Sequence, residues 1–232
     1  MNKKMPVIDI IIPAYNEEQS VGKVIHDLPK YGVRHIIVCD NNSTDRTAAV
    51  AAEFGAVVVK TTIKGYGRAC LSGIDYIKSC ETKPDIVVFI DGDYSDYPEQ
   101  MPDLISPIIH DDVDLVIGSR ALGDMQKGSM TVPQIFGNWL ATNLIRLIYG
   151  YEFTDLGPFR AIKWEKLLIC NMEDKDFGWT VEMQVKAAKL GFKTGEFPVN
   201  YRKRIGKSKV SGTVKGTILA GHKILWTIFK LM

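Results

Sequence analysis

Two aspartates, Asp91 and Asp93, flank a single glycine directly after the apolar run 86–90. Two carboxylates at this spacing can point toward one hard cation, and Gly92 allows the backbone to turn and approach a ligand closely. A magnesium or manganese ion bound in this way would keep open positions for phosphate oxygens and would neutralise a departing diphosphate. Aspartates are also common in solvated turns, so the pair alone leaves both interpretations open. Its place after a buried strand strengthens the metal-site interpretation.

Three further polar clusters follow apolar runs, at residues 14–17, 40–42 and 119–120. In an open parallel sheet, ligands bind beyond the carboxyl ends of the strands. We therefore expect these clusters and the aspartate pair to form one site at one edge of a sheet. Within the second cluster, Asp40 is the candidate for contact with a base or a ribose, although turn formation is the simpler role for such residues.

Lys64 and Gly65 begin the segment KGYGR, in which two glycines precede a helical pattern. The backbone N–H groups at the start of a helix can bind an anion, so this segment is a candidate phosphate contact. Because Cys70 stands where the third glycine of a G-x-G-x-x-G motif would be, a Rossmann dinucleotide site is disfavoured.

The elements that must position these clusters alternate between strand and helix patterns. Short β-branched runs typical of buried strands cover residues 7–12, 35–39, 57–60, 86–90 and 115–118. Helical patterns cover residues 20–28, 44–54, 67–79 and 98–109. This alternation predicts βαβ units and a largely parallel sheet. After residue 120 it ends: a loop is expected at 121–133, and amphipathic helices at 134–149 and 180–190.

The composition is that of an ordinary globular domain, with 232 residues, 46% hydrophobic and 24% charged, so one domain is expected. A formal net charge of +2 does not indicate a nucleic-acid partner. The four cysteines form no C-x-x-C pair, and this usage suits a reduced, cytoplasmic environment. No stretch reaches the ~18 uncharged apolar residues that a spanning helix requires.

Five motifs in order resemble the signature of the family 2 glycosyltransferases: IIPAYNEE, VCDNNSTDRT, KGYGRACLSGI, FIDGDYSDYPE and VIGSR. The similarity is closest to the dolichyl-phosphate mannosyltransferase and polyprenyl-phosphate hexosyltransferase branch, which TDLGPFRAI and RKRIGKSKVSG also resemble. It spans roughly residues 7–215. The resemblance implies an α/β fold of the GT-A type, a single domain with a Rossmann-like, mostly parallel sheet flanked by helices. It also implies inverting transfer of a hexose from a UDP- or GDP-linked donor to a polyprenyl phosphate.

The resemblance also assigns roles to the polar clusters. It implies a nucleotide-sugar site that includes Pro13, Ala14, Tyr15, Glu17, Asp40, Lys64, Gly65, Asp91, Gly92, Asp93 and Arg120. Asp91 and Asp93 would hold Mg²⁺ or Mn²⁺ and the diphosphate, and Arg120 would face a phosphate or the sugar. The chain departs from the family pattern at Asn41, where an acidic residue is usual, and at Gly92, where alanine is frequent.

The chemistry of the acceptor decides which other residues matter. A hydroxyl acceptor needs a base, for which Asp155 and Glu182 are the candidates. A lipid phosphate is already anionic and needs nearby cations instead. Residues 202–209 supply five cations in eight residues, although such a run also suits a solvated face. The expected acceptor-phosphate residues are Arg160, Arg202, Lys207 and Lys209, and Asp155 either orients them or acts as the base.

Residues 213–232 carry apolar side chains and lysines at helical spacing, with Trp226 among them. Such a helix could lie in the membrane interface, as could the helix at 134–149, or each could present an ordinary core face. We expect a catalytic domain at 1–212 and an interfacial helix at 213–232, with the protein peripheral at the cytoplasmic face of a membrane. The alternatives are a soluble family 2 glycosyltransferase acting on a hydroxyl, a sugar-phosphate nucleotidyltransferase and a non-catalytic binding module.

Overall fold

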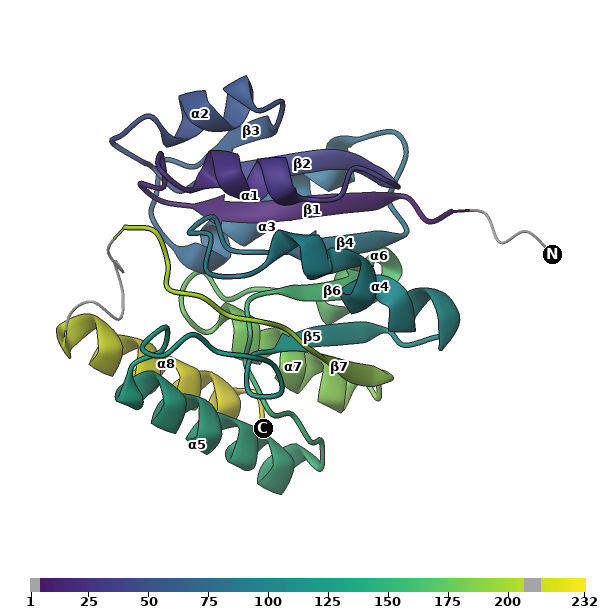
Figure 1. The fold of residues 1–232 in the computed structure, drawn as a ribbon. Coiled ribbons are helices and arrows are strands. Elements are labelled where there is room, and N and C mark those ends of the chain that lie inside the picture. Colours follow the sequence, from purple (N-terminus) through teal and green to yellow (C-terminus); the bar gives the residue numbers. More distant parts are fainter. Residues whose placement is uncertain (1–4, 207–213) are drawn as a thin grey trace.

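Seven strands form one sheet in the order β3-β2-β1-β4-β6-β5-β7 (Figure 1). The computed structural model describes residues 5–206 and 214–232. The strands are β1 (Ile8–Ala14), β2 (Val33–Asp40), β3 (Val57–Lys60), β4 (Ile86–Phe89), β5 (Leu115–Ser119), β6 (Arg160–Lys163) and β7 (Thr194–Pro198). Only β6 runs against its neighbours, β4 and β5. The other strands therefore all end at the same edge of the sheet.

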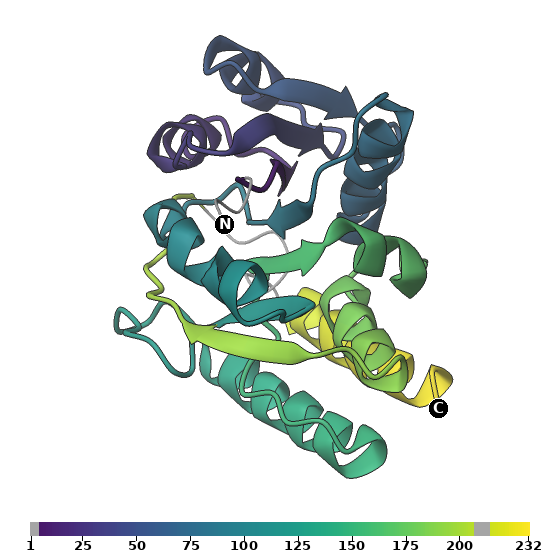
Figure 2. The ribbon, with the colours of Figure 1, turned by 90° about the vertical axis from the view of Figure 1, so that its right-hand side faces the viewer.

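Helices cover both faces of this sheet (Figures 1 and 2). One face is covered by α1 (Val21–Asp27), α2 (Thr47–Glu53) and α4 (Met101–His110), which follows the 3₁₀ turn η1 (Pro98–Gln100). The other face is covered by α3 (Tyr66–Ser79), α5 (Val132–Tyr149), α6 (Trp164–Cys170), α7 (Trp179–Lys189) and α8 (Val214–Lys230). Because both faces are covered, all seven residues of β1 are buried, and the strand is apolar except for Asp9.

The α/β class and the mostly parallel sheet predicted from the sequence are confirmed, and so are all five predicted strands. The sequence analysis missed β6, α6 and β7. β6 has four residues and begins with a charged one, so it carries neither length nor periodicity as a signal. β7 lies at the edge of the sheet, is only partly buried and contains Gly195 and Pro198, which are both depleted in strands.

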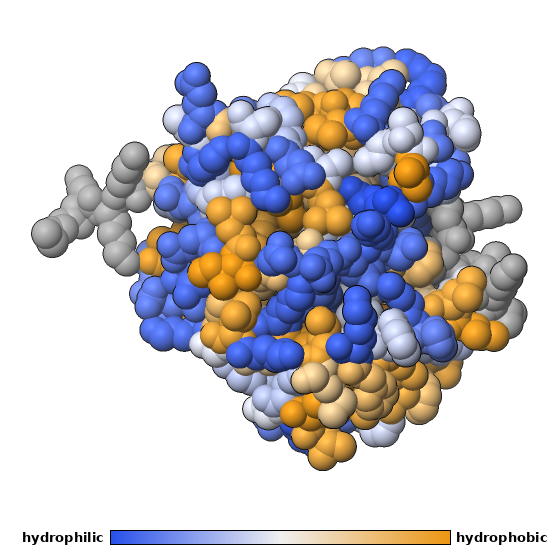
Figure 3. Space-filling view, turned by 180° about the vertical axis from the view of Figure 1, so that it is seen from behind, coloured by the Kyte–Doolittle hydropathy of each residue, from blue (hydrophilic) through white to orange (hydrophobic). Residues whose placement is uncertain are grey.

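The C-terminal helix α8 packs against α5 and α7 as part of the same α/β body. Ile228 is fully buried, and the Tyr149 hydroxyl of α5 donates a 2.6 Å hydrogen bond to its carbonyl oxygen. The opposite sides of α5 and α8 leave large apolar side chains exposed, and orange atoms gather over this part of the surface in Figure 3. These side chains are Val132, Ile135, Phe136, Trp139 and Leu147 on α5 and Ile218, Leu219, Trp226 and Phe229 on α8. No described helix has the length and apolar character needed to cross a bilayer.

The close packing of α3 on the sheet gives a stability prediction. A Cβ atom on Gly73 would come within 2.8 Å of Cys39 Sγ and 2.9 Å of Ile11 Cγ2, whereas a Cβ on Gly137 of α5 would meet no atom within 4 Å. We expect Gly73→Ala to lower the free energy of unfolding by about 1–3 kcal/mol through overpacking. Gly137→Ala should raise it by about 0.5–1 kcal/mol through helix propensity. Urea denaturation of both variants tests this, and equal midpoints would contradict the packing argument.

Candidate active site

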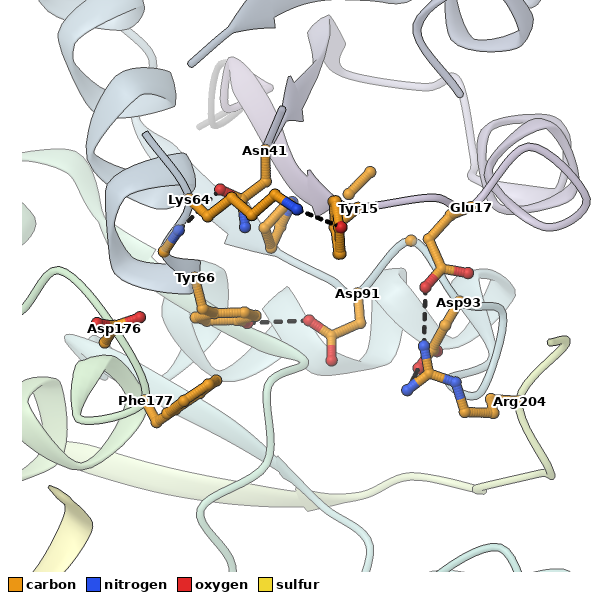
Figure 4. Close-up of a pocket in the computed structure, with 14 residues that line it drawn as sticks. Tyr15, Glu17, Asn41, Lys64, Tyr66, Asp91, Asp93, Asp176, Phe177 and Arg204 are labelled. Atoms are coloured by element: carbon orange, nitrogen blue, oxygen red, sulfur yellow. Dashed lines mark hydrogen bonds and ion pairs between the residues drawn. The ribbon is translucent and has the colours of Figure 1, made fainter. Parts of the chain in front are cut away.

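The polar clusters at the ends of the strands line one pocket of about 310 Å³, here called the first pocket (Figure 4). Its lining residues are Pro13, Ala14, Tyr15, Glu17, Asn41, Lys64, Gly65, Tyr66, Asp91, Gly92, Asp93, Asp176, Phe177 and Arg204. The ends of β1, β2 and β4 meet there because these strands are parallel neighbours. Most of the nucleotide-sugar residues expected from the sequence thus lie together; Asp40 and Arg120 do not line this pocket.

Asp91 and Asp93 follow β4, and each uses one oxygen to hold its own position. The Tyr66 hydroxyl donates a 2.9 Å hydrogen bond to Asp91 Oδ1. Ser95 donates to Asp93 Oδ1 from its backbone N–H at 2.9 Å and from its hydroxyl at 2.5 Å. Figure 4 shows the second oxygen of Asp91 turned away from Tyr66. The pair therefore still offers oxygen atoms to a ligand in the pocket.

Burial and mutual repulsion make the two carboxylates hard to ionise together. Burial, and next the charge of Asp93, raise the pKa of Asp91 to about 7. Hard carboxylate oxygens suit Mg²⁺ or Mn²⁺, which often take one or two protein carboxylates and complete their shell with phosphate and water. Among the described residues no group of three or more acidic, histidine or cysteine side chains could hold a metal ion. The residues present thus fit a cation shared with a diphosphate better than a closed protein site.

Within residues 5–206, Arg204 places its guanidinium against this pair, and the sequence analysis did not select it. Its guanidinium contacts Glu17 Oε1 at 2.8 Å and Asp93 Oδ2 at 3.2 Å (Figure 4). The other Glu17 oxygen, Oε2, accepts a 2.9 Å hydrogen bond from the Ser20 hydroxyl. The run of five cations was visible in the sequence, but nothing in it distinguished Arg204 from its neighbours.

The KGYGR segment brings Lys64 to the first pocket beside Tyr15, with the ammonium group 4.2 Å from the ring centre. The prediction that its backbone N–H groups bind an anion is not supported at two positions. The N–H of Gly65 donates to Asn41 Oδ1 at 2.9 Å, and that of Arg68 donates to the Lys175 carbonyl at 3.1 Å. The glycines serve a close approach instead, since a Cβ on Gly67 would lie 2.0 Å from the Asp174 carbonyl oxygen.

Asp40 and Asn41 exchange the roles expected from the sequence. Asp40 is buried, and its Oδ1 accepts a 3.1 Å hydrogen bond from the Ser43 N–H, so it stabilises the turn after β2. Asn41 lines the pocket in its place. Successive side chains of an extended chain point in opposite directions, which explains why the neighbour of the expected residue faces the ligand side.

Arg120 and Asp155 form a buried, two-pronged ion pair. Arg120 donates from Nε to Asp155 Oδ2 at 2.7 Å and from Nη2 to Oδ1 at 2.6 Å, and its backbone N–H also reaches Oδ2 at 2.8 Å. Burial lowers the pKa of Arg120, but the charge and hydrogen bonds of Asp155, together with Tyr201 and Asp96, raise it above its usual value. Both oxygens of Asp155 are therefore engaged in holding Arg120.

Glu182, the other base candidate, is also committed to structure. Its Oε1 and Oε2 accept backbone N–H bonds from Glu173 and Asp174 at 2.9 and 2.8 Å, and Lys186 lies 2.7 Å from Oε1. These contacts tie the loop before α7 to the helix. The sequence could not separate this role from a catalytic one.

A second pocket, also about 310 Å³, adjoins the first and shares Tyr66, Asp91, Asp93, Phe177 and Arg204 with it. Arg120 lines its inner part. Its outer part runs between α5 and α8, where it is lined by Pro133, Gln134, Gly137, Asn138, Ala220, Gly221 and Ile224. Arg120 and Arg204, together with Asp91 and Asp93, thus line one part of this pocket, and mainly small or apolar residues, with Gln134 and Asn138 among them, line the part between the two helices.

Two residues expected at the acceptor phosphate have other roles. Arg160 is fully buried, and its guanidinium donates to the carbonyl oxygens of Gly157 and Thr180 at 2.5 and 2.9 Å. Arg202 stacks 3.5 Å from the Tyr94 ring centre and donates to the Tyr94 carbonyl at 2.8 Å. Both guanidiniums brace the chain around the site and line neither pocket. Lys207 and Lys209 lie outside the described residues.

Comparison with known proteins identifies relatives over nearly the whole chain. The family model described as glycosyl transferase family 2 matches residues 9–167. An uncharacterised glycosyltransferase of Mycobacterium bovis is 36% identical over 216 residues, which cover 92% of this chain and 94% of the relative. The undecaprenyl-phosphate mannosyltransferase of Micrococcus luteus is 31% identical over 221 residues, which cover 89% and 88%.

A solved structure supports the fold. Glucosyl-3-phosphoglycerate synthase from Mycobacterium tuberculosis, in complex with Mn²⁺, uridine-diphosphate-glucose and phosphoglyceric acid, has a TM-score of 0.76 to this chain. Its sequence is 22% identical, and the alignment covers 97% of this chain and 79% of that one. Since the family model spans more than half of the chain and a relative is 36% identical over most of it, the chain belongs to glycosyltransferase family 2 and has its GT-A fold.

Proposed function

We propose that this glycosyltransferase transfers a hexose from a UDP- or GDP-linked donor to a polyprenyl phosphate, with inversion at the anomeric carbon. The observation that carries the proposal is the pair of adjoining pockets. They share Asp91 and Asp93, and the second has cations within and an apolar exit. A lipid phosphate has the same two-part chemistry. The similarity to an undecaprenyl-phosphate mannosyltransferase supports this choice of acceptor.

The first pocket is assigned to the donor. Tyr15 and Asn41 would contact the nucleoside, and Lys64 would contact a phosphate. Asp91 and Asp93 would hold Mg²⁺ or Mn²⁺, which would stabilise the diphosphate as the bond to the sugar breaks. The presence of Mn²⁺ and uridine-diphosphate-glucose in the structurally similar synthase supports this assignment.

The second pocket is assigned to the acceptor. Arg120, held in place by Asp155, would bind the acceptor phosphate, and the gap between α5 and α8 would take the isoprenoid chain. A phosphate oxygen is already anionic near pH 7 and needs no base. This chemistry agrees with the engagement of both base candidates, Asp155 and Glu182, in structural contacts. A hydroxyl acceptor would require one of them to be released.

The proposed place of action is the cytoplasmic face of a membrane, and the exposed apolar sides of α5 and α8 support peripheral binding to a membrane. Trp139, Trp226 and Phe229 lie on these sides and are each more than half exposed. Aromatic side chains suit the boundary between headgroups and acyl chains. The two helices would then rest on the lipid surface with the exit of the second pocket between them.

Removal of either carboxylate tests the chemistry of the donor site. We expect Asp91→Asn and Asp93→Asn each to reduce transfer by about 100-fold or more, because each removes charge that stabilises the departing diphosphate. Transfer from a panel of UDP- and GDP-hexoses to undecaprenyl phosphate would be measured with and without Mn²⁺. Circular dichroism would establish that the variants are folded. Wild-type activity in either folded variant would contradict the metal role.

The raised pKa of Asp91 predicts how stability depends on pH in the metal-free protein. The folded-state pKa of about 7 lies above the unfolded value near ~3.9, so the folded state holds this proton more tightly. The resulting stabilisation is complete below about pH 4 and is lost as the pH rises through 7.

The side chain that Asp91→Asn introduces is neutral at every pH. We therefore expect the Tm difference between this variant and wild type to be larger at pH 8 than at pH 5 by at least about 2 °C, with the variant the more stable at pH 8. Asp93→Asn is the comparison variant, because it removes the ion pair with Arg204 and also the second-largest cause of the raised Asp91 pKa. Since burial of Asp91 remains, the Tm difference of this variant from wild type should change less between pH 5 and pH 8 than that of Asp91→Asn. Thermal denaturation in EDTA provides the comparison, and a Tm difference for Asp91→Asn that does not change with pH would contradict the assignment.

A side chain added inside the gap between α5 and α8 tests the acceptor. A Cβ on Gly137 or Gly221 would meet no atom within 4 Å, and both residues line the pocket, so we expect a leucine at either position to narrow it. We expect Gly137→Leu and Gly221→Leu to slow transfer to undecaprenyl phosphate by about ten-fold or more, a loss of at least ~1.4 kcal/mol in transition-state binding. Transfer to geranyl phosphate, which has a short chain, should change less.

His222→Leu is the matched control, since His222 is exposed on α8 beside Gly221 and does not line the pocket. It should leave transfer to both acceptors within two-fold of wild type. Nucleotide binding, measured by calorimetry, should be the same in all three variants. Unchanged transfer to undecaprenyl phosphate in the glycine variants would rule out this path for the lipid and favour a soluble acceptor.

A further inference from the structure

Arg204 occupies the oxygen of Asp93 that a metal ion would use. Asp93 Oδ1 is committed to Ser95, from which it accepts two hydrogen bonds. The oxygen that remains, Oδ2, lies 3.2 Å from Arg204 Nη1. A divalent cation that binds this carboxylate in the first pocket therefore competes with a guanidinium of the protein itself.

Backbone hydrogen bonds to a neighbouring segment hold the main chain around Arg204, whereas its side chain reaches both pockets. The chain at residues 201–205 runs beside the segment after β4: Arg202 N–H donates to the Ser95 carbonyl at 2.9 Å, and Ile205 N–H donates to the Asp93 carbonyl at 3.0 Å. The Arg204 side chain is 29% exposed, and it lines both pockets. Rotation about its side-chain bonds can thus move the charge from Asp93 toward either pocket without any change in the backbone.

The guanidinium is not fully satisfied where it lies. Its Nη atoms contact Glu17 and Asp93, but Nε is buried and has no hydrogen-bond partner among the described residues. An unpaired buried donor costs free energy, and for a charged group the cost is larger. A phosphate group in either pocket would offer several acceptor oxygens, two of which a planar guanidinium can bind through parallel N–H···O bonds.

We propose that Arg204 is an exchangeable internal cation. In the free enzyme it is a positioning residue that holds Asp93; when metal and nucleoside diphosphate bind, its guanidinium leaves Asp93 and pairs with a phosphate. The metal alone must break the Arg204–Asp93 contact and leave the guanidinium with fewer partners. With the diphosphate present, the displaced guanidinium gains an anionic partner. Metal and diphosphate therefore bind cooperatively, and by linkage each raises the affinity for the other by the same factor. This inference rests on the proposed metal site at Asp91 and Asp93.

Mn²⁺ binding tests the exchange independently of transfer. Free Mn²⁺ would be measured by electron paramagnetic resonance in titrations of the full chain, without nucleotide and with saturating UDP or GDP, each corrected by a protein-free blank. Arg204→Gln removes the competing charge. We expect it to bind Mn²⁺ about ten-fold more tightly than wild type without nucleotide, and to lose that gain when the diphosphate is present. Its affinity for UDP or GDP in the presence of Mn²⁺ should fall by a similar factor.

Lys203→Gln is the control for a change in net charge, because Lys203 is the exposed neighbour of Arg204 and lines neither pocket. It should change Mn²⁺ affinity by less than about two-fold in either condition. Arg204→Lys keeps the charge, and it should bind Mn²⁺ alone nearly as weakly as wild type. This variant also covers the case in which Arg204→Gln fails to fold, because Lys lacks the planar fork and should still weaken diphosphate binding.

The exchange is overturned if folded Arg204→Gln binds Mn²⁺ alone no more tightly than wild type, or if Arg204→Lys binds diphosphate as well as wild type does. A purely structural role for Arg204 would lower Mn²⁺ affinity in both conditions. If no protein binds Mn²⁺ under any condition, the metal site of the proposed function fails along with the exchange. If Mn²⁺ binding follows the expected pattern but no lipid phosphate accepts sugar, only the proposed acceptor fails.

Discussion

The carboxylates of Asp91 and Asp93 lie at the end of one buried strand, where ionising both is costly unless positive charge is close. The protein meets this constraint in different ways at neighbouring positions. Arg204 neutralises Asp93, whereas burial raises the pKa of Asp91 to about 7, so that a proton compensates for it near neutrality. Burial, and next the charges of Asp91 and Asp93, also raise the pKa of Asp96. In the proposed function a divalent cation would replace both the proton and the guanidinium at this strand end.

The carboxylates around the two pockets differ in how the protein holds their oxygen atoms. Asp155 and Glu182 each accept hydrogen bonds from the protein through both oxygens. Asp155 thereby holds Arg120, and Glu182 holds the loop before α7. Asp91 and Asp93 each use a single oxygen to fix their own orientation. A carboxylate acts on a ligand only through an oxygen that faces the ligand. Burial does not distinguish these aspartates, since both Asp93 and Asp155 are buried. They differ in how the second oxygen is held: Asp93 Oδ2 is held by the 3.2 Å ion pair with Arg204, whereas both oxygens of Asp155 accept short hydrogen bonds from Arg120.

The sequence predicted the strands whose burial on both faces produces a clear apolar run along the chain. β1, β2 and β4 are covered on both faces, so their apolar runs are recognisable, and their parallel order places the polar residues that follow them at one edge. The short strand β6 and the edge strand β7 carry no such pattern. At the site, the sequence could not show that Asn41 rather than Asp40 lines the first pocket, because this depends on which way each side chain turns. Arg160 and Arg202 could not be told from Arg204, since all three carry the same charge and only tertiary contacts separate bracing from binding.

The helices α5 and α8 show why amphipathic periodicity left two interpretations open. Each has a side packed into the body, where Ile145 and Ile228 are fully buried, and a second apolar side exposed to solvent, where Trp139 and Phe229 lie. A core face and an exposed apolar face therefore coexist on one helix, and neither excludes the other. Between these sides, small residues such as Gly137 and Gly221 keep the helices from filling the second pocket. A Cβ atom at either position would meet no atom within 4 Å, so core packing does not require glycine there. The second pocket thus contains both these small residues and the charged groups of Arg120, Arg204, Asp91 and Asp93, the two kinds of lining on which the proposed acceptor depends.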